Sequence, residues 1–215
     1  MPATFRSVTA WEQGSGPTVT VGKPSGLADG DMLVAVCAST PASGWTGEDG
    51  TWTQSQITNG TVRLEFLWRN AGASEPSTFD FTTGGSVTGA AVCLLALQNS
   101  GVTGGLNPYG SASASSTYEL PELTTIDDSE IMIQAFASDY VGDITVPSAS
   151  TLVNYQFTYL NLCVSYEVAV SAGAQPAVTF ASTDTDTSRS VFAWSFRGAG
   201  WEAVARPSAF MLFVD

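Results

Sequence analysis

The stretch Val62-Arg-Leu-Glu-Phe-Leu-Trp68 decides the fold. Apolar side chains alternate along it with a second set that contains the charged residues, and this period of two is the pattern of a half-buried β-strand. We expect one face of the strand to point into a core and the other face to be solvated. The inward set is Val62, Leu64, Phe66 and Trp68, and the outward set is Arg63, Glu65, Leu67 and Arg69.

Two further stretches are apolar on both faces and therefore predict central strands. They are Met32–Cys37 and Ile131–Phe136. Turn clusters rich in Gly, Pro, Asn and Asp separate about twelve strand candidates, and no segment has a convincing helical period. The chain is therefore predicted to be all-β, an antiparallel β-sandwich of jelly-roll-like form.

The sequence also predicts two pseudo-repeated halves. Gly30–Ser39 matches Ser129–Ser138 at an offset of 99 residues, and the inward set of 62–68 matches Leu162, Val164, Tyr166 and Val168 at an offset of 100. We expect half-repeats at about 18–99 and 117–197, joined by the Gly/Ser-rich segment 100–116 as a surface crossover or flexible loop. The halves would form a single sandwich domain over 1–199, with two small domains as the alternative.

The charge balance excludes several classes of function. The 215 residues include 20 acidic and 7 basic side chains and no histidine, for a net charge of −13. Imidazole metal sites and Ser-His-Asp or Cys-His catalysis are therefore excluded. Neither nucleic acid nor membrane is expected as a partner, because cations are few and no apolar run could span a bilayer. With no visible secretory signal, we expect a soluble protein made in a cytoplasm.

The cysteines lie in separate apolar runs. Cys37, Cys93 and Cys163 are predicted to be buried free thiols. One disulfide with an odd thiol, or an intermolecular bridge, is the alternative.

The acidic residues do not predict catalysis, a cofactor or a metal. Glu65 and Glu167 are expected on a solvated outer face rather than as the carboxylate pair of a glycosidase. Asp127-Asp128 and Asp184-Thr-Asp186 cluster oxygen ligands but lack the calcium loop of an EF-hand. We therefore expect a non-enzymatic protein without a cofactor.

Aromatic and apolar residues supply the candidate contact sites. Trp45 and Trp52 bracket a loop in which exposed rings could stack on sugars or dock on protein, or could instead pack as lids over the sandwich. The C-terminal segment 200–215 would be a tail or extra strand that contacts a neighbour, or a last strand along its own sandwich. Its candidate contact residues are Trp201, Phe210, Met211, Leu212, Phe213 and Val214.

A set of turn and packing motifs over roughly residues 18–100 carries a family resemblance. In order, these motifs are Lys23-Pro24, the Gly26–Asp31 turn before an apolar strand, Gly44-Trp45, Trp68-Arg-Asn-Ala71 and Glu75-Pro-Ser-Thr-Phe79. This order resembles β-sandwich structural proteins in the virions of tailed bacteriophages, which include head decoration and tail or fibre accessory proteins. The pattern contains no catalytic residues to carry over.

The resemblance implies a place in the virion for a protein made in the host cytoplasm. The expected function is that of a capsid decoration or cement protein on the outer head surface. The implied partners are the major capsid protein or tail proteins, and a homo-oligomer is expected, with a trimer favoured. The alternative is a tail or fibre accessory protein that binds host-surface glycan through the loop bearing Trp45 and Trp52.

Overall fold

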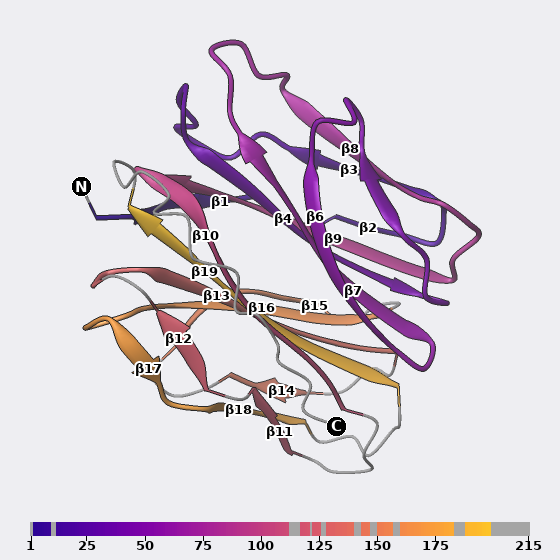
Figure 1. Ribbon diagram of the computed structural model, residues 1–215. Helices are drawn as coiled ribbons and strands as arrows, with labels where there is room; N and C mark the ends of the chain where they lie inside the picture. Colours follow the sequence, from indigo (N-terminus) through magenta and orange to yellow (C-terminus); the bar gives the residue numbers. More distant parts are fainter. Residues whose placement is uncertain are drawn as a thin grey trace, which may run out of the picture.

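The computed structural model contains β-strands and no helix among the residues that it describes (Figure 1). These residues are 2–9, 12–111, 117–120, 122–125, 128–139, 143–146, 150–156, 160–182 and 188–198. Every strand pairing among them is antiparallel. The prediction of an all-β antiparallel fold is therefore confirmed.

The first half of the chain forms two sheets. The first inner sheet has the order β1 (Thr4–Val8), β9 (Gly89–Gln98), β4 (Met32–Thr40), β7 (Val62–Asn70) and β6 (Thr53–Asn59), and β2 (Glu12–Gly14) also pairs with β9. The first outer sheet has the order β3 (Thr18–Gly22), β8 (Thr78–Thr83) and β5 (Trp45–Gly47).

The second half forms a second inner sheet, a second outer sheet and a short ribbon. The second inner sheet has the order β10 (Ser100–Ser111), β19 (Arg189–Gly198), β13 (Ile131–Ser138), β16 (Asn161–Val168) and β15 (Thr151–Gln156). The second outer sheet has the order β11 (Thr117–Leu120), β18 (Val178–Ser182) and β14 (Ile144–Thr145). The ribbon pairs β12 (Leu123–Thr125) with β17 (Gly173–Gln175).

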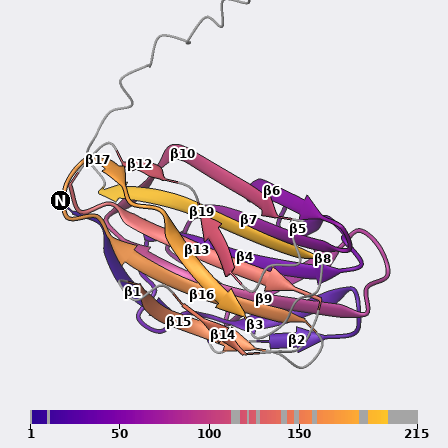
Figure 2. The same cartoon turned by 90° about the horizontal axis from the view of Figure 1, so that it is seen from below.

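The sheets stack in four layers, with the two inner sheets face to face (Figure 1). One core fills the space between the inner sheets, where Phe66 packs on Phe192 and Trp68 packs on Trp194 at ring-centroid distances of 4.6 and 4.2 Å. Separate cores lie between each inner sheet and its outer sheet. Figure 2 shows the view through this stack, in which strands of the two inner sheets overlie one another.

Eight strands of each half occur in the same order within their sheets, whereas β2 and the ribbon of β12 and β17 have no separate counterpart among the described strands. The inner order β1, β9, β4, β7, β6 matches β10, β19, β13, β16, β15, and the outer order β3, β8, β5 matches β11, β18, β14. The predicted central strands are central, because β4 lies between β9 and β7 and β13 lies between β19 and β16. Both are buried along their whole length.

The register corrects one detail of the predicted match between halves. Val34 lies opposite Trp68, and Ile133, which is 99 residues later, lies opposite Tyr166. Trp68 therefore corresponds to Tyr166 at an offset of 98, and the predicted offset of 100 for this strand is wrong. An alternating strand matches its partner equally well after a two-residue slip, so the sequence pattern does not reveal the shift.

The segment that joins the halves also differs from the expected loop. Residues Ser100–Ser111 form β10, which pairs along β19, and residues 112–116 lie outside the described residues. The Gly/Ser-rich composition disfavours a strand by propensity alone. The hydrogen-bonding edge of β19 offers a long backbone partner, and this tertiary pairing overrides the local preference.

The three cysteines are buried thiols that form no disulfide, as predicted. Burial raises the pKa of the Cys163 thiol to about 12 and raises that of Cys37 as well. These thiols are therefore protonated at neutral pH and behave as small apolar groups of the core.

Candidate functional site

The structure places the two loop tryptophans against the core. Trp45 is 1% exposed and lies on β5, opposite Thr83. Trp52 is half-buried, and its ring contacts Phe79 and Phe81 edge-on at centroid distances of 6.4 and 5.2 Å. This arrangement agrees with the alternative interpretation of these residues as lids, and it removes Trp45 from the surface that a ligand could reach.

The backbone beneath Trp52 explains how this ring is held. A Cβ atom on Gly47 would lie 2.2 Å from Cδ1 of Trp52, so any larger residue at this position would displace the Trp52 ring. The guanidinium of Arg69 lies over the Trp52 ring, 5.0 Å from its centroid. The loop is therefore fixed by contacts within the chain.

The remaining contact candidates cannot be placed. Trp201 and the residues Phe210, Met211, Leu212, Phe213 and Val214 lie outside the described residues. The same holds for Asp127, Asp184 and Asp186, which the sequence suggests as oxygen ligands.

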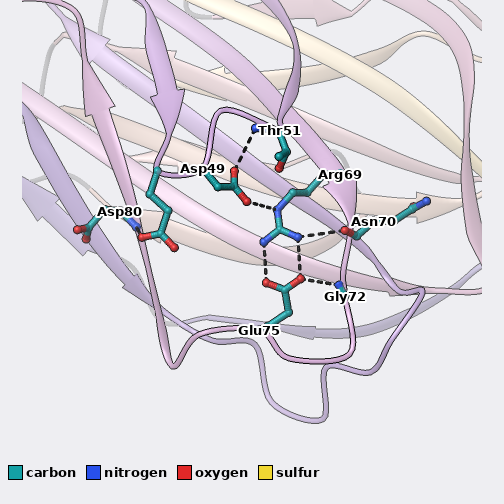
Figure 3. Close-up of polar contacts among 8 residues, drawn as sticks. Asp49, Thr51, Arg69, Asn70, Gly72, Glu75 and Asp80 are labelled. Atoms are coloured by element: carbon teal, nitrogen blue, oxygen red, sulfur yellow. Dashed lines mark hydrogen bonds and ion pairs between the residues drawn. The ribbon is translucent and has the colours of Figure 1, made fainter.

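Arg69, Glu75 and Asp49 form a group of ion pairs, the Arg69 clamp, that the sequence did not predict (Figure 3). Its Nη1 and Nη2 atoms donate to the two carboxylate oxygens of Glu75, both at 2.6 Å, and Asp49 Oδ2 lies 3.5 Å from Nε. The backbone N–H of Gly72 donates to the same Glu75 carboxylate at 2.6 Å. The hydrogen bonds from Arg69 lower the pKa of Glu75, so the pair is ionised at neutral pH.

Glu65 corrects the prediction of a solvated outer face. Its side chain is fully buried, because the first outer sheet covers this face of β7. Arg63 Nε donates to Glu65 Oε2 at 2.8 Å, and the backbone N–H of Trp45 donates to the same oxygen at 3.2 Å. Burial nevertheless raises the pKa of Glu65. Glu65 thus links β5 to β7 inside the protein. Glu167 on β16 is half-buried.

A third ion pair lies at the start of the first inner sheet. Arg6 Nε is 2.7 Å from Asp31 Oδ2, and the backbone N–H of Ala28 donates to the same oxygen at 2.8 Å. The three arginines Arg6, Arg63 and Arg69 are therefore neutralised by carboxylates of the chain itself.

This internal pairing leaves an anionic surface. Among the described residues, Lys23 is the one exposed basic residue, whereas eight acidic residues are exposed. These are Glu12, Asp29, Glu48, Asp49, Glu119, Glu122, Asp128 and Asp143. A partner that approaches the described surface therefore meets negative charge.

A depression of about 420 Å³ opens at one corner of the first inner sheet. Strand β6 begins opposite Trp68, so the last two residues of β7 extend past it and leave a notch in the sheet edge. The notch is covered from the second inner sheet by Ser100, the first residue of β10. The lining residues are Met32, Thr51, Thr53, Trp68, Arg69, Asn70 and Ser100.

The neutral polar lining of this corner includes Thr53 and Asn70, whose side chains are exposed, and Ser100. Ser100 is 6% exposed, and its buried Oγ is unpaired. Asn70 uses its backbone carbonyl to accept from Arg69, while its side chain points away from the clamp (Figure 3). No sequence motif marks these residues, because they come from three separate strands.

The described residues contain no group of three metal-ligating side chains, and no helix there is long and apolar enough to cross a membrane. No family model, curated protein or solved structure matches the chain.

Proposed function

We propose that the chain is a non-enzymatic structural protein of a bacteriophage virion, a decoration protein bound in many copies to the outer surface of the head. The observation that carries the proposal is the distribution of charge. Arg6, Arg63 and Arg69 are neutralised by ion pairs with carboxylates of the same chain. The exposed charged side chains of the described surface are almost all acidic.

This distribution suits a protein that lies beside many copies of itself. Like charge on neighbouring copies keeps them soluble and separated before they bind, and it disfavours attachment to nucleic acid. The stacked sheets bury their large apolar residues, with Val168 and Val170 as the exposed ones among the described residues. We therefore assign the specific contacts with the shell to the C-terminal segment. Its apolar residues 209–214 would dock on the capsid or on a neighbouring subunit.

The test is the copy number of the protein in purified particles, measured by gel densitometry against the major capsid protein. The proposal predicts hundreds of copies per particle and loss of incorporation when residues 208–215 are deleted from a chain that still folds. A few to some tens of copies would instead favour the tail or fibre alternative, and absence from particles would contradict both.

A further inference from the structure

Each inner sheet has on one side an edge strand that pairs with the last strand of its half. In the second inner sheet this strand is β10, which pairs along β19 and follows β9 in the chain with one residue, Asn99, between them. The chain therefore crosses from the first inner sheet to the second directly after β9. In the first inner sheet the edge strand is β1, which comes from the N-terminal segment and pairs with β9.

The segment that follows β19 has the same place in chain order as β10, because β19 matches β9 in the order of the sheets. Gly198 ends β19 and lies opposite Ser100, which is two residues after Gln98, the last residue of β9. The chain therefore leaves β19 beside the end of β9. A crossover like the one after β9 would carry the next residues onto the edge of β9 that β1 occupies.

The sequence after β19 agrees with this placement. The central strands β4 and β13 pair with β9 and β19 in registers that differ by a constant 99 residues. At the same offset, Gly101 and Pro108 of β10 match Gly200 and Pro207. Glycine and proline restrict the backbone more specifically than other residues do, so residues 199–208 match β10 at its two most demanding positions.

The same offset predicts which residue of this segment would meet each residue of β9. Val102 lies opposite Phe196 in the second half, so Trp201 is expected opposite Leu97. In the structure, Phe5 of β1 lies opposite Leu97. An apolar residue therefore stands at this point in all three segments.

The edge of β9 is filled less completely than the edge of β19. It is covered by two pieces, the five residues of β1 and the three residues of β2, whereas β10 covers β19 with twelve residues. Between the two pieces, the backbone N–H of Leu94 donates to the side-chain hydroxyl of Thr9 at 3.3 Å. A continuous strand of the β10 kind would add backbone hydrogen bonds at this break.

An ion pair holds β1 in place. Arg6 Nε lies 2.7 Å from Asp31 Oδ2, and the Asp31 side chain is 4% exposed. Residues 202–204, which would take the place of Arg6, are Glu, Ala and Val and bring no cation to Asp31. The ion pair therefore favours β1 on this edge, whereas the length of the strand favours residues 199–208.

We propose that residues 199–208 exchange with β1 on the edge of β9 within the same chain. Trp201 then takes the place of Phe5, whose ring stacks on Tyr166 with a centroid distance of 4.6 Å and an interplanar angle of 2°. The exchange is a conformational switch that releases residues 2–8 from the sheet. It leaves the rest of the C-terminal segment for the contacts assigned to it above, and it does not rest on the virion proposal.

The test is disulfide trapping in the full chain, with Gln98→Cys as the common anchor. Thr4 lies opposite Gln98 and both residues are exposed, so Thr4→Cys traps β1 in its place. Gly101 lies opposite Arg197, so Gly200 is expected opposite Gln98 and Gly200→Cys reports the exchange. Cross-linking under mild oxidation is followed by non-reducing gel electrophoresis and peptide mass spectrometry.

We expect both cysteine pairs to form a cross-link within one chain. Arg6→Gln should raise the rate of the Gly200 cross-link about fivefold, because it removes the ion pair that favours β1. Trp201→Ala should lower that rate without slowing the Thr4 cross-link.

The combination of Gln98→Cys with Ser208→Cys is the register control. In the proposed register Ser208 lies opposite Val92, about 20 Å along β9 from Gln98, so this pair should not cross-link. The proposal is overturned if the Gly200 pair cross-links no faster than the Ser208 pair, if it cross-links only between two chains, or if Arg6→Gln leaves its rate unchanged.

Discussion

At the end of the first inner sheet, Asn70 and Ser100 surround an open depression, whereas at the matching end of the second inner sheet Val168 and Ala3 occupy the same positions. The backbone register of the two ends is the same, so the difference lies in the side chains. Val168 is 43% exposed and Asn70 is exposed as well, so this position lies at the surface in both halves, whereas Ala3 and Ser100 are both buried. The fold therefore accepts either a polar or an apolar side chain at each of the two positions.

The same comparison applies inside the sheets. Glu65 lies opposite Cys37 in the first half. Phe136, which is 99 residues after Cys37, lies opposite Cys163 in the second half. The first half therefore has a buried carboxylate where the second half has a buried thiol. The first half needs Arg63 to hold this charge, and the second half has no such requirement. The following variants change the differences between the halves, in decreasing order of expected effect.

Arg63→Met should have the largest effect. It leaves the buried Glu65 carboxylate without its cation, and breaking such a pair costs about 3–5 kcal/mol. The free energy of unfolding, measured by urea denaturation, should fall by about 3 kcal/mol. The double variant Arg63→Met, Glu65→Leu should recover most of this loss, and a double variant as unstable as the single one would contradict the assignment.

Gly47→Val tests the support of Trp52. Gly47 corresponds to Val146, because Trp45 lies opposite Thr83 and Ile144 lies opposite Ser182. A side chain fits in the second half, but in the first half it would overlap the Trp52 ring. We expect a loss of about 2 kcal/mol in the free energy of unfolding and a red shift of tryptophan fluorescence as Trp52 is displaced. An unchanged spectrum would show that Trp52 is not seated on Gly47.

Glu75→Gln should alter the pH dependence of stability. The pKa of Glu75 is lowered below its ordinary value of 4.5 by the hydrogen bonds from Arg69, so its contribution is present above pH 4.5 and is lost as the pH falls below it. The variant should be about 1 kcal/mol less stable at pH 7, and this difference should shrink towards pH 3. Glu65→Gln provides the opposite sign, because burial raises the pKa of Glu65 and favours its protonated form in the folded protein. A difference for Glu75→Gln that is constant with pH would contradict the role of the clamp.

Ser100→Ala should have the smallest effect. It removes a buried hydroxyl without a partner among the described residues and creates the residue type of Ala3, which stands at the matching position of the first half, so the free energy of unfolding should rise by about 0.5 kcal/mol. Ala3→Ser is the matched control and should lower it by about 1 kcal/mol, since its hydroxyl would enter a closed core. A loss of stability in Ser100→Ala would mean that the hydroxyl has a structural partner.

The sequence predicts the fold class and the central strands, because period-two patterns report burial within one strand. It misplaces Glu65, since the same pattern cannot show that a second sheet covers the outer face of β7. It also misses the corner depression. Ser100, Asn70 and Thr53 are brought together by the pairing of distant strands, and each alone has the character of an ordinary surface residue. The two tryptophans of the loop 45–52 suggest an exposed contact site, but Gly47 and Arg69 hold the Trp52 ring against Phe79 and Phe81 of the first outer sheet.

The most direct test of the difference between the two halves is urea denaturation of Arg63→Met beside the double variant Arg63→Met, Glu65→Leu. We expect the single variant to lose about 3 kcal/mol in the free energy of unfolding and the double variant to recover most of this loss, because the second half has the thiol of Cys163 where the first half has Glu65. Equal losses in the two variants would contradict the account.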